Sequence, residues 1–135
     1  MARALTAYLK KEDVPSREAL QGALDPMGFK IVVDNDYTPF ETRGYVPCAL
    51  DGEDAGFDLR FQEAAAESQS KFSLADDAVV MAIRWGGDPR EELAALAVAS
   101  ALALQFGATV EEPGANDPLS PEEVLAKARK AAKSL

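Results

Sequence analysis

The chain has 135 residues, of which 47% are hydrophobic, so it has the size of one domain (residues 1 to 135) and enough apolar side chains to bury a core. Its one cysteine and its lack of histidine exclude an internal disulfide, Cys/His zinc sites and His-based catalysis. The net charge of −9 is concentrated in residues 31 to 123, where nineteen acidic and five basic side chains give −14. This field repels nucleic acid and anionic membranes and favours a basic partner, although solubility alone also explains an acidic surface.

Targeting and membrane segments are not expected. The first sixteen residues contain only short apolar pieces interrupted by charges, unlike the apolar core of a secretory signal. The longest uncharged apolar run, residues 93 to 104, is shorter than the roughly 20 residues that cross a bilayer. We therefore expect a cytoplasmic protein.

The first third of the chain predicts a strand-helix-strand unit. Residues 3 to 10 alternate between apolar and polar side chains, as in a half-buried strand. Ser16 is a suitable N-cap for a short amphipathic helix, and Gly28 suits the position just beyond its end. Residues 29 to 34 then repeat the alternation of a strand.

A polar and aromatic loop follows at residues 34 to 44, and its Asp34-Asn35-Asp36 sequence has the initial spacing of a calcium-binding loop. Proline and tyrosine stand where such a loop requires glycine and a bidentate glutamate, so an ordinary loop is the better interpretation. Two aromatic residues, Tyr37 and Phe40, are candidates for contact with a partner or for anchoring the loop to its own domain.

Residues 45 to 50 and 56 to 62 predict a hairpin joined by an acidic turn. The second strand alternates strictly, which indicates one buried and one exposed face. Pro47 cannot donate a hydrogen bond within a sheet, so the first strand belongs at an edge or at a bulge. Residues 64 to 77 contain few apolar anchors and predict a loop with one helical turn.

The strongest local signals lie between residues 78 and 110. An apolar strand is followed by a Gly-Gly-Asp-Pro turn, in which Asp88 is an N-cap and Glu91 its partner in a capping box. No charged residue occurs from Leu93 to Leu104, so we expect this helix to be covered on more than one side. A glycine ends the helix before a short strand.

A final helix is predicted from a second capping box, Ser120 and Glu123, to the C-terminus. Basic residues near its end complement the helix dipole. Its apolar stripe is expected to consist of Val124, Ala128, Ala131 and Leu135.

Taken in order, these elements predict an α+β fold. We expect a mostly antiparallel sheet of about five to six strands, covered by two to three helices. The predicted order is βαβ-ββ-βαβ-α.

Candidate chemical sites are few. The glycine pair before Asp88 resembles a phosphate-binding turn, but three nearby carboxylates repel an anion, and we expect no cofactor. Cys48 has no histidine to activate it and is expected to be a small buried hydrophobe. The carboxylates of residues 51 to 58 could assemble a metal or acid-base site, but solvated turn residues are the simpler interpretation, and we expect no metal.

Charge, size and missing catalytic chemistry predict a non-enzymatic, acidic protein-binding module that acts on a basic protein, for example a bacterial toxin-neutralising or immunity protein. Two alternatives stay open: a domain that forms homodimers through its apolar helix, and a carboxylate- or metal-dependent enzyme. We expect no nucleic acid and no membrane among the partners. The predicted partner-binding residues are Asp34, Asp36, Tyr37, Phe40, Glu41, Asp51, Glu53, Asp54 and Asp58.

Overall fold

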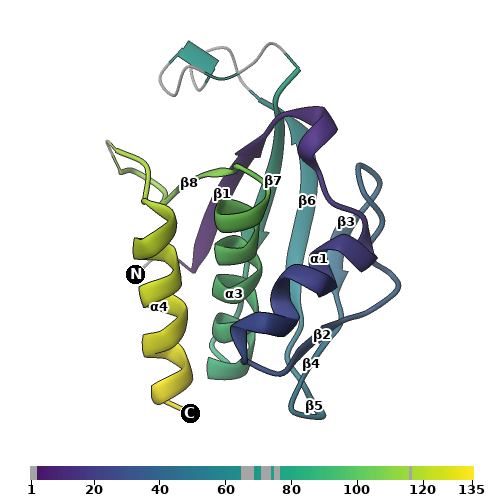
Figure 1. Ribbon diagram of the computed structural model, residues 1–135, viewed down its shortest axis with the longest axis vertical. Coiled ribbons are helices and arrows are strands. Elements are labelled where there is room, and N and C mark those ends of the chain that lie inside the picture. Colours follow the sequence, from purple (N-terminus) through teal and green to yellow (C-terminus); the bar gives the residue numbers. More distant parts are fainter. Residues whose placement is uncertain (1–2, 65–68, 71–73, 75–76, 116) are drawn as a thin grey trace.

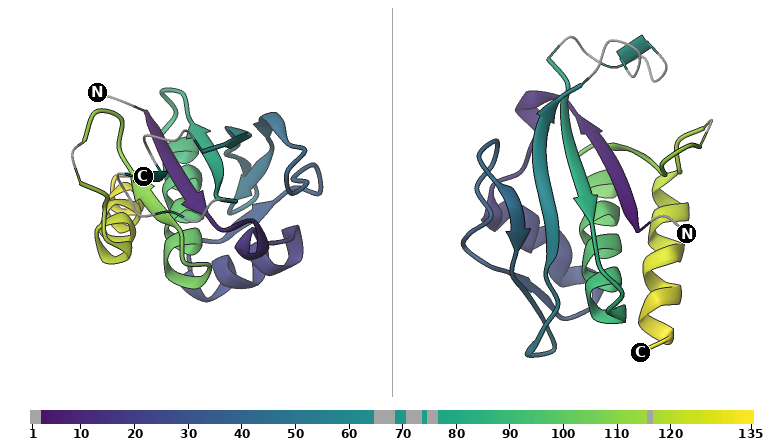
Figure 2. Two further views of the ribbon diagram at one scale, coloured as in Figure 1. Left: turned by 90° about the horizontal axis from the view of Figure 1, so that it is seen from above. Right: turned by 180° about the vertical axis from the view of Figure 1, so that it is seen from behind.

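The computed structural model describes residues 3–64, 69–70, 74, 77–115 and 117–135. The described residues form an α+β fold, as predicted, whose labelled elements are a five-stranded antiparallel sheet, a three-stranded sheet and the α-helices α1, α3 and α4 (Figure 1). The three helices lie on one face of the larger sheet (Figure 2). The predicted loop at residues 64 to 77 lies mainly outside the described residues.

The larger sheet has the strand order β3-β6-β7-β1-β8. Strand β1 lies between β7 and β8 and is antiparallel to both, so helix α3 connects two parallel strands that are not neighbours. On β1 the apolar positions face the helices, as the alternation predicts. The strands are β1 (Ala4–Leu9), β3 (Arg43–Val46), β6 (Phe57–Glu63), β7 (Val79–Arg84) and β8 (Thr109–Glu111).

The smaller sheet corrects two predictions. The segment predicted as one strand at residues 45 to 50 is divided at Pro47 into β3, which pairs with β6, and β4, which pairs with β2. Pro47 has no N–H group, and its carbonyl accepts a hydrogen bond from Asp34 N at 3.1 Å. The strand predicted at residues 29 to 34 therefore belongs to this smaller sheet, whereas one sheet was expected. Its strands are β2 (Ile31–Val33), β4 (Cys48–Leu50) and β5 (Glu53–Asp54).

The helices begin where their caps were predicted. Ser16 accepts from Ala19 N at 3.1 Å, Asp88 from Arg90 N at 2.9 Å, and Ser120 forms the complete capping box with Glu123. The capping box predicted at Asp88 is wrong in one detail, because Glu91 accepts from Gly86 N, at 3.1 Å, and not from Asp88 N. The helices are α1 (Arg17–Leu24), α3 (Pro89–Gln105) and α4 (Pro121–Lys133), with 3₁₀ turns at Lys11–Asp13 and Asp25–Met27.

Helix α3 is the centre of the core, as predicted. All residues from 93 to 103 are buried, because the larger sheet, α1 and α4 pack around them, and only Leu104 of the apolar run is 39% exposed. The many alanines let these elements approach closely, and the Ser100 hydroxyl donates to Leu96 O at 2.8 Å. The expected stripe of α4 ends earlier than predicted, since Leu135 is 57% exposed.

Helix α1 closes the outer edge of β2. The side-chain amide of Gln21 donates to Ile31 O and accepts from Val33 N, and Arg17 Nε donates to Val33 O, each at 2.8 Å. These contacts take the place of a neighbouring strand, which leaves the edge unavailable for pairing with another chain. No helix in the described part of the chain is long and apolar enough to cross a membrane.

Candidate protein-binding surface

The outer face of the smaller sheet combines exposed apolar and acidic side chains. Val32, Ala49 and Asp54 are paired in register across β2, β4 and β5, so they share one face, and Val32 is 51% exposed. Burial alternates along residues 45 to 50, which places Tyr45 on the same side as Ala49. Tyr45 is 57% exposed. The opposite face is buried in the core.

Two of the predicted acidic loops meet at this face. Asp34 lies two residues beyond Val32 and continues the pairing with β4 through its bond to Pro47, while Asp54 lies in β5. Asp34 also accepts from Asp36 N at 3.2 Å, which fixes the turn that presents both carboxylates. Hereafter the acidic face means Val32, Asp34, Tyr45, Ala49 and Asp54.

Ion pairing divides the seven predicted acidic residues into two groups. Asp51 pairs with Lys30 at 3.9 Å, Glu53 with Arg90 at 2.5 Å and Asp58 with Arg60 at 3.0 Å. The other four make no ion pair with any described residue, so their charges are available to a partner: Asp34, Asp36, Glu41 and Asp54.

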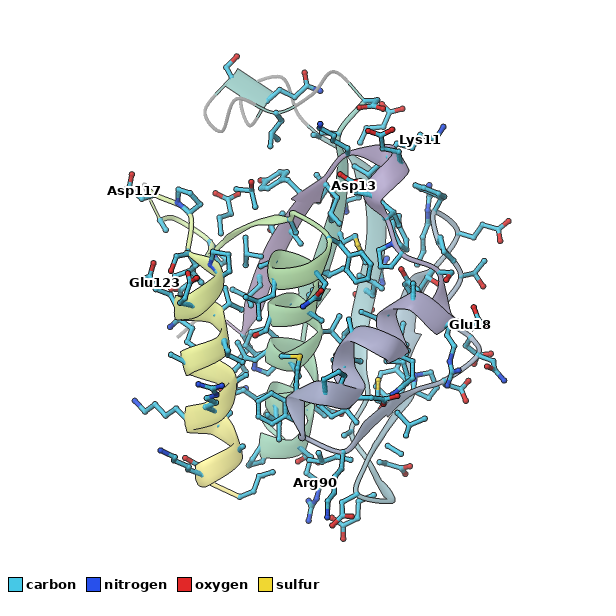
Figure 3. The ribbon with its side chains drawn as sticks, viewed as in Figure 1. Lys11, Asp13, Glu18, Arg90, Asp117 and Glu123 are labelled. Carbon is cyan, nitrogen blue, oxygen red and sulfur yellow. The ribbon has the colours of Figure 1, made fainter. Side chains whose placement is uncertain are left out.

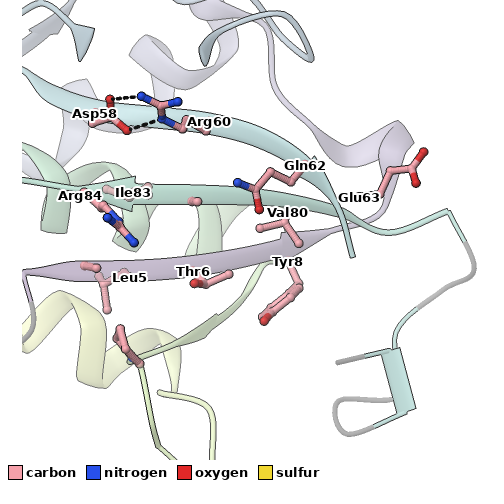
Figure 4. Close-up of a pocket in the computed structure, with 13 residues that line it drawn as sticks. Leu5, Thr6, Tyr8, Asp58, Arg60, Gln62, Glu63, Val80, Ile83 and Arg84 are labelled. Carbon is pink, nitrogen blue, oxygen red and sulfur yellow. Dashed lines mark hydrogen bonds and ion pairs between the residues drawn. The ribbon is translucent and has the colours of Figure 1, made fainter. Parts of the chain in front are cut away.

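Asp58 does not belong to the acidic face. It lies on β6, opposite Arg84 of β7, on the face of the larger sheet that the helices leave open. Its carboxylate is held by Arg60, as Figure 4 shows. Asp58 stays a predicted partner-binding residue, but it lies outside the acidic face.

Tyr37, for which contact with a partner and anchoring of the loop were both open, is buried. Its side chain is 2% exposed, its ring packs 6.2 Å from that of Phe61, and its hydroxyl donates to Pro15 O at 2.8 Å. Tyr37 therefore anchors the loop to the domain, which was the alternative interpretation. Phe40 is 41% exposed and packs on Phe61, at 5.8 Å between ring centroids, with Lys11 over its ring.

Replacing Tyr37 by phenylalanine is expected to lower the free energy of unfolding by about 1–3 kcal/mol, because the Pro15 carbonyl then stays buried without its donor. Urea unfolding measures this, and Tyr45→Phe, at an exposed tyrosine, should change stability by less than about 0.5 kcal/mol.

Burial raises the pKa of Tyr37 above its usual value of 10.0, so its neutral form stabilises the native state below about pH 10. That contribution is lost as pH rises further, so Tyr37→Phe should lose less of its free energy of unfolding at alkaline pH. If Tyr37→Phe and Tyr45→Phe were equally stable at every pH, the anchoring role of Tyr37 would be contradicted.

The other candidate sites, at Cys48, at the glycine turn and among the carboxylates, give less support to a function. Cys48 is buried, and burial raises the pKa of its thiol to about 12, so the side chain packs as a small hydrophobe, as expected. The glycine turn before α3 is occupied by the Glu91 carboxylate. Among the described residues, no three carboxylates or thiols are grouped closely enough to hold a metal ion.

The feature that the sequence did not reveal is a groove of about 820 Å³ on the open face of the larger sheet (Figure 4). The strict alternation of β6 predicted that Asp58, Arg60 and Gln62 face outward. It did not predict their neighbours, because Ala82 and Thr6 are distant in sequence, and only the register places Ala82 beside Arg60 and Thr6 beside Ala82.

Comparison of the chain with models of protein families, with curated proteins and with solved structures found no match. Inference about function therefore rests on the surfaces described above.

Proposed function

We propose that the chain is a non-enzymatic protein-binding module that presents its acidic face to a basic protein. The observation that carries this proposal is the coincidence of uncompensated carboxylates with exposed apolar side chains. Of the five large hydrophobic residues that are exposed among those described, Val32 and Tyr45 lie on this face and Phe40 lies in the adjoining loop. Surfaces of this kind combine an aromatic anchor with a charge that attracts the partner.

Electrostatics supports a basic partner. Partial burial raises the pKa of Tyr45, and the nearby carboxylates of Glu91 and Asp54 raise it further, so negative charge lies near this ring. Asp34, Asp36 and Asp54 add to a field that already belongs to a chain of charge −9. A basic protein would be attracted from a distance and then packed against Tyr45 and Val32. A toxin-neutralising or immunity protein is one concrete form of this function.

Self-association through the apolar helix receives no such support. Residues 93 to 103 are buried within the chain itself, so they offer no surface to a second copy.

The test begins by identifying proteins that the immobilised chain captures from its native cells and then measures their association and dissociation rates. We expect a basic partner whose association slows about tenfold between low and high salt, because salt screens the field. The variant Asp34→Asn/Asp36→Asn/Asp54→Asn should slow association severalfold at low salt. Tyr45→Ala should chiefly accelerate dissociation, because it removes a packed anchor.

A matched control carries the same charge change elsewhere: Asp13→Asn/Asp117→Asn/Glu122→Gln. Asp13 and Asp117 lie at the end of the molecule opposite β5 (Figure 3). This control should slow association much less than the triple variant of the acidic face. An acidic partner, or equal effects of the two triple variants, would contradict the proposal.

A further inference from the structure

The open face of the larger sheet carries more positive charge than the acidic chain as a whole suggests. Arg43 of β3 lies directly opposite Arg60 of β6, and Arg84 of β7 lies opposite Asp58. Like charges placed opposite each other on a sheet destabilise it unless an anion lies between them. The carboxylates that lie on this face or line its groove are Asp58, Glu63 and Glu111; Asp58 pairs with Arg60, and Glu111 accepts the hydroxyl of Tyr8.

Arg84 is the arginine lining the groove that pairs with no described residue. Both oxygens of Asp58 are engaged by Arg60, with Nε at 3.0 Å and the second guanidinium nitrogen at 3.5 Å. Arg84 forms no ion pair or side-chain hydrogen bond with the described residues, and the same holds for the amide of Gln62 and the hydroxyl of Thr6. Three unengaged hydrogen-bonding groups therefore line one groove.

The groove exists because small side chains lie at its centre. Ala82 and Thr6 are paired in register, and Ala4 lies opposite Arg84, whereas β6 contributes the long side chains of Arg60 and Gln62. Its lining residues follow β1, β6 and β7 over about five residues each, a length of roughly 16 Å at the rise of a strand. The lining strands β6, β7 and β1 are neighbours at a spacing of about 4.8 Å, so the groove is roughly 10 Å wide.

The shape fits one extended peptide better than a helix or a compact molecule. An extended chain with its side chains is narrow enough for this width, since packed sheets lie about 10 Å apart. A helix with its side chains is about 10–12 Å wide and needs more room. Polar groups of the groove can bond to peptide amides, and the guanidinium of Arg84 is suited to bind a carboxylate with two hydrogen bonds.

We propose that this groove binds an extended, acidic segment of a partner protein, with a carboxylate on Arg84. The net charge of −9 repels a strongly charged polyanion such as nucleic acid, so the ligand carries few carboxylates. This site adjoins the acidic face at Tyr45, which lies opposite Asp58 in register, but the acidic residues Asp34 and Asp54 do not line the groove.

The test uses the full chain labelled with ¹⁵N and the peptide acetyl-Ala-Glu-Ala-Glu-Ala-amide, with its Gln analogue as the uncharged comparison. We expect saturable shifts of the backbone amide signals of β1, β6 and β7 with the Glu peptide, and at least tenfold weaker binding of the Gln peptide. Arg84→Gln should weaken binding of the Glu peptide by a similar factor. Ala82→Leu should abolish it by filling the groove without changing the charge.

Two controls separate this proposal from the preceding one. Arg129→Gln removes an exposed arginine of α4 and should leave peptide binding unchanged, and so should the triple variant of the acidic face. Equal binding of the two peptides, unchanged binding in Arg84→Gln and Ala82→Leu, or tighter binding of a short DNA duplex to the same residues would overturn the inference. None of these results bears on binding of a basic protein to the acidic face.

Discussion

Leu102→Asp is expected to unfold most of the protein. Leu102 is 0% exposed and lies near the end of the run of α3 that is buried on all sides. An aspartate there has no cation and no water within the core, which costs at least about 4 kcal/mol. Because domains of this size are stable by about 5–15 kcal/mol, the variant should lose most of its stability. Leu96→Asp, at 5% exposure, should behave in the same way.

The control for this prediction lies two residues further along the same helix. Leu104 is 39% exposed, so Leu104→Asp makes the same chemical change where water can solvate the charge, and it should cost no more than about 1 kcal/mol. Lys130→Ala, at an exposed position of α4, should be nearly silent. Urea unfolding followed by circular dichroism measures all four variants. Similar midpoints for Leu102→Asp and Leu104→Asp would mean that α3 is not the centre of the core.

Gly56→Ala is expected to destabilise the protein by about 1–3 kcal/mol through overpacking. A Cβ atom at Gly56 would overlap the Tyr45 ring and would lie 2.5 Å from Val46 O. The exposed ring of Tyr45 can move away, but the carbonyl belongs to the backbone of β3 and is fixed by its pairing with β6. The substitution should therefore weaken the joint between β3 and β6.

Gly22→Ala makes the same chemical change as Gly56→Ala, but it is expected to raise the stability of the protein. Gly22 lies within α1, and a Cβ atom there would have no neighbour within 4 Å. Alanine is the better helix former, so stability should rise by about 0.5–1 kcal/mol. Thermal unfolding of Gly22→Ala, Gly56→Ala and the double variant Gly56→Ala/Tyr45→Ala shows whether the new Cβ atom at position 56 clashes with the Tyr45 ring or with the Val46 carbonyl. If the double variant recovered full stability, the aromatic ring and not the carbonyl would be the source of the strain.

The carboxylates of the candidate surface could be predicted from the sequence, whereas the position of the aromatic Tyr37 could not. Exposed carboxylates in loops are evident from residue type and turn chemistry, and Asp34, Asp36 and Asp54 lie at the surface without ion pairs among the described residues. Tyr37 was ambiguous, because an aromatic side chain in a loop packs inward or outward according to the space beneath it. Here that space lies next to Phe61, far along the chain.

The sequence by itself determined the elements that depend on near neighbours. Helix starts at Ser16, Asp88 and Ser120 follow from side chains that reach amides two or three residues away, and the uncharged run of α3 required burial wherever the helix lay.

Only the tertiary structure decided which strands pair and what the open face contains. Alternation in β2 is equally compatible with pairing to β1 or to β4, and the change of sheet at Pro47 depends on partners from distant segments. The groove beside Arg84 arises because the register sets Ala82 beside Arg60 and Ala4 beside Arg84. Register is fixed by packing across the whole core, and no local pattern in a single strand contains it.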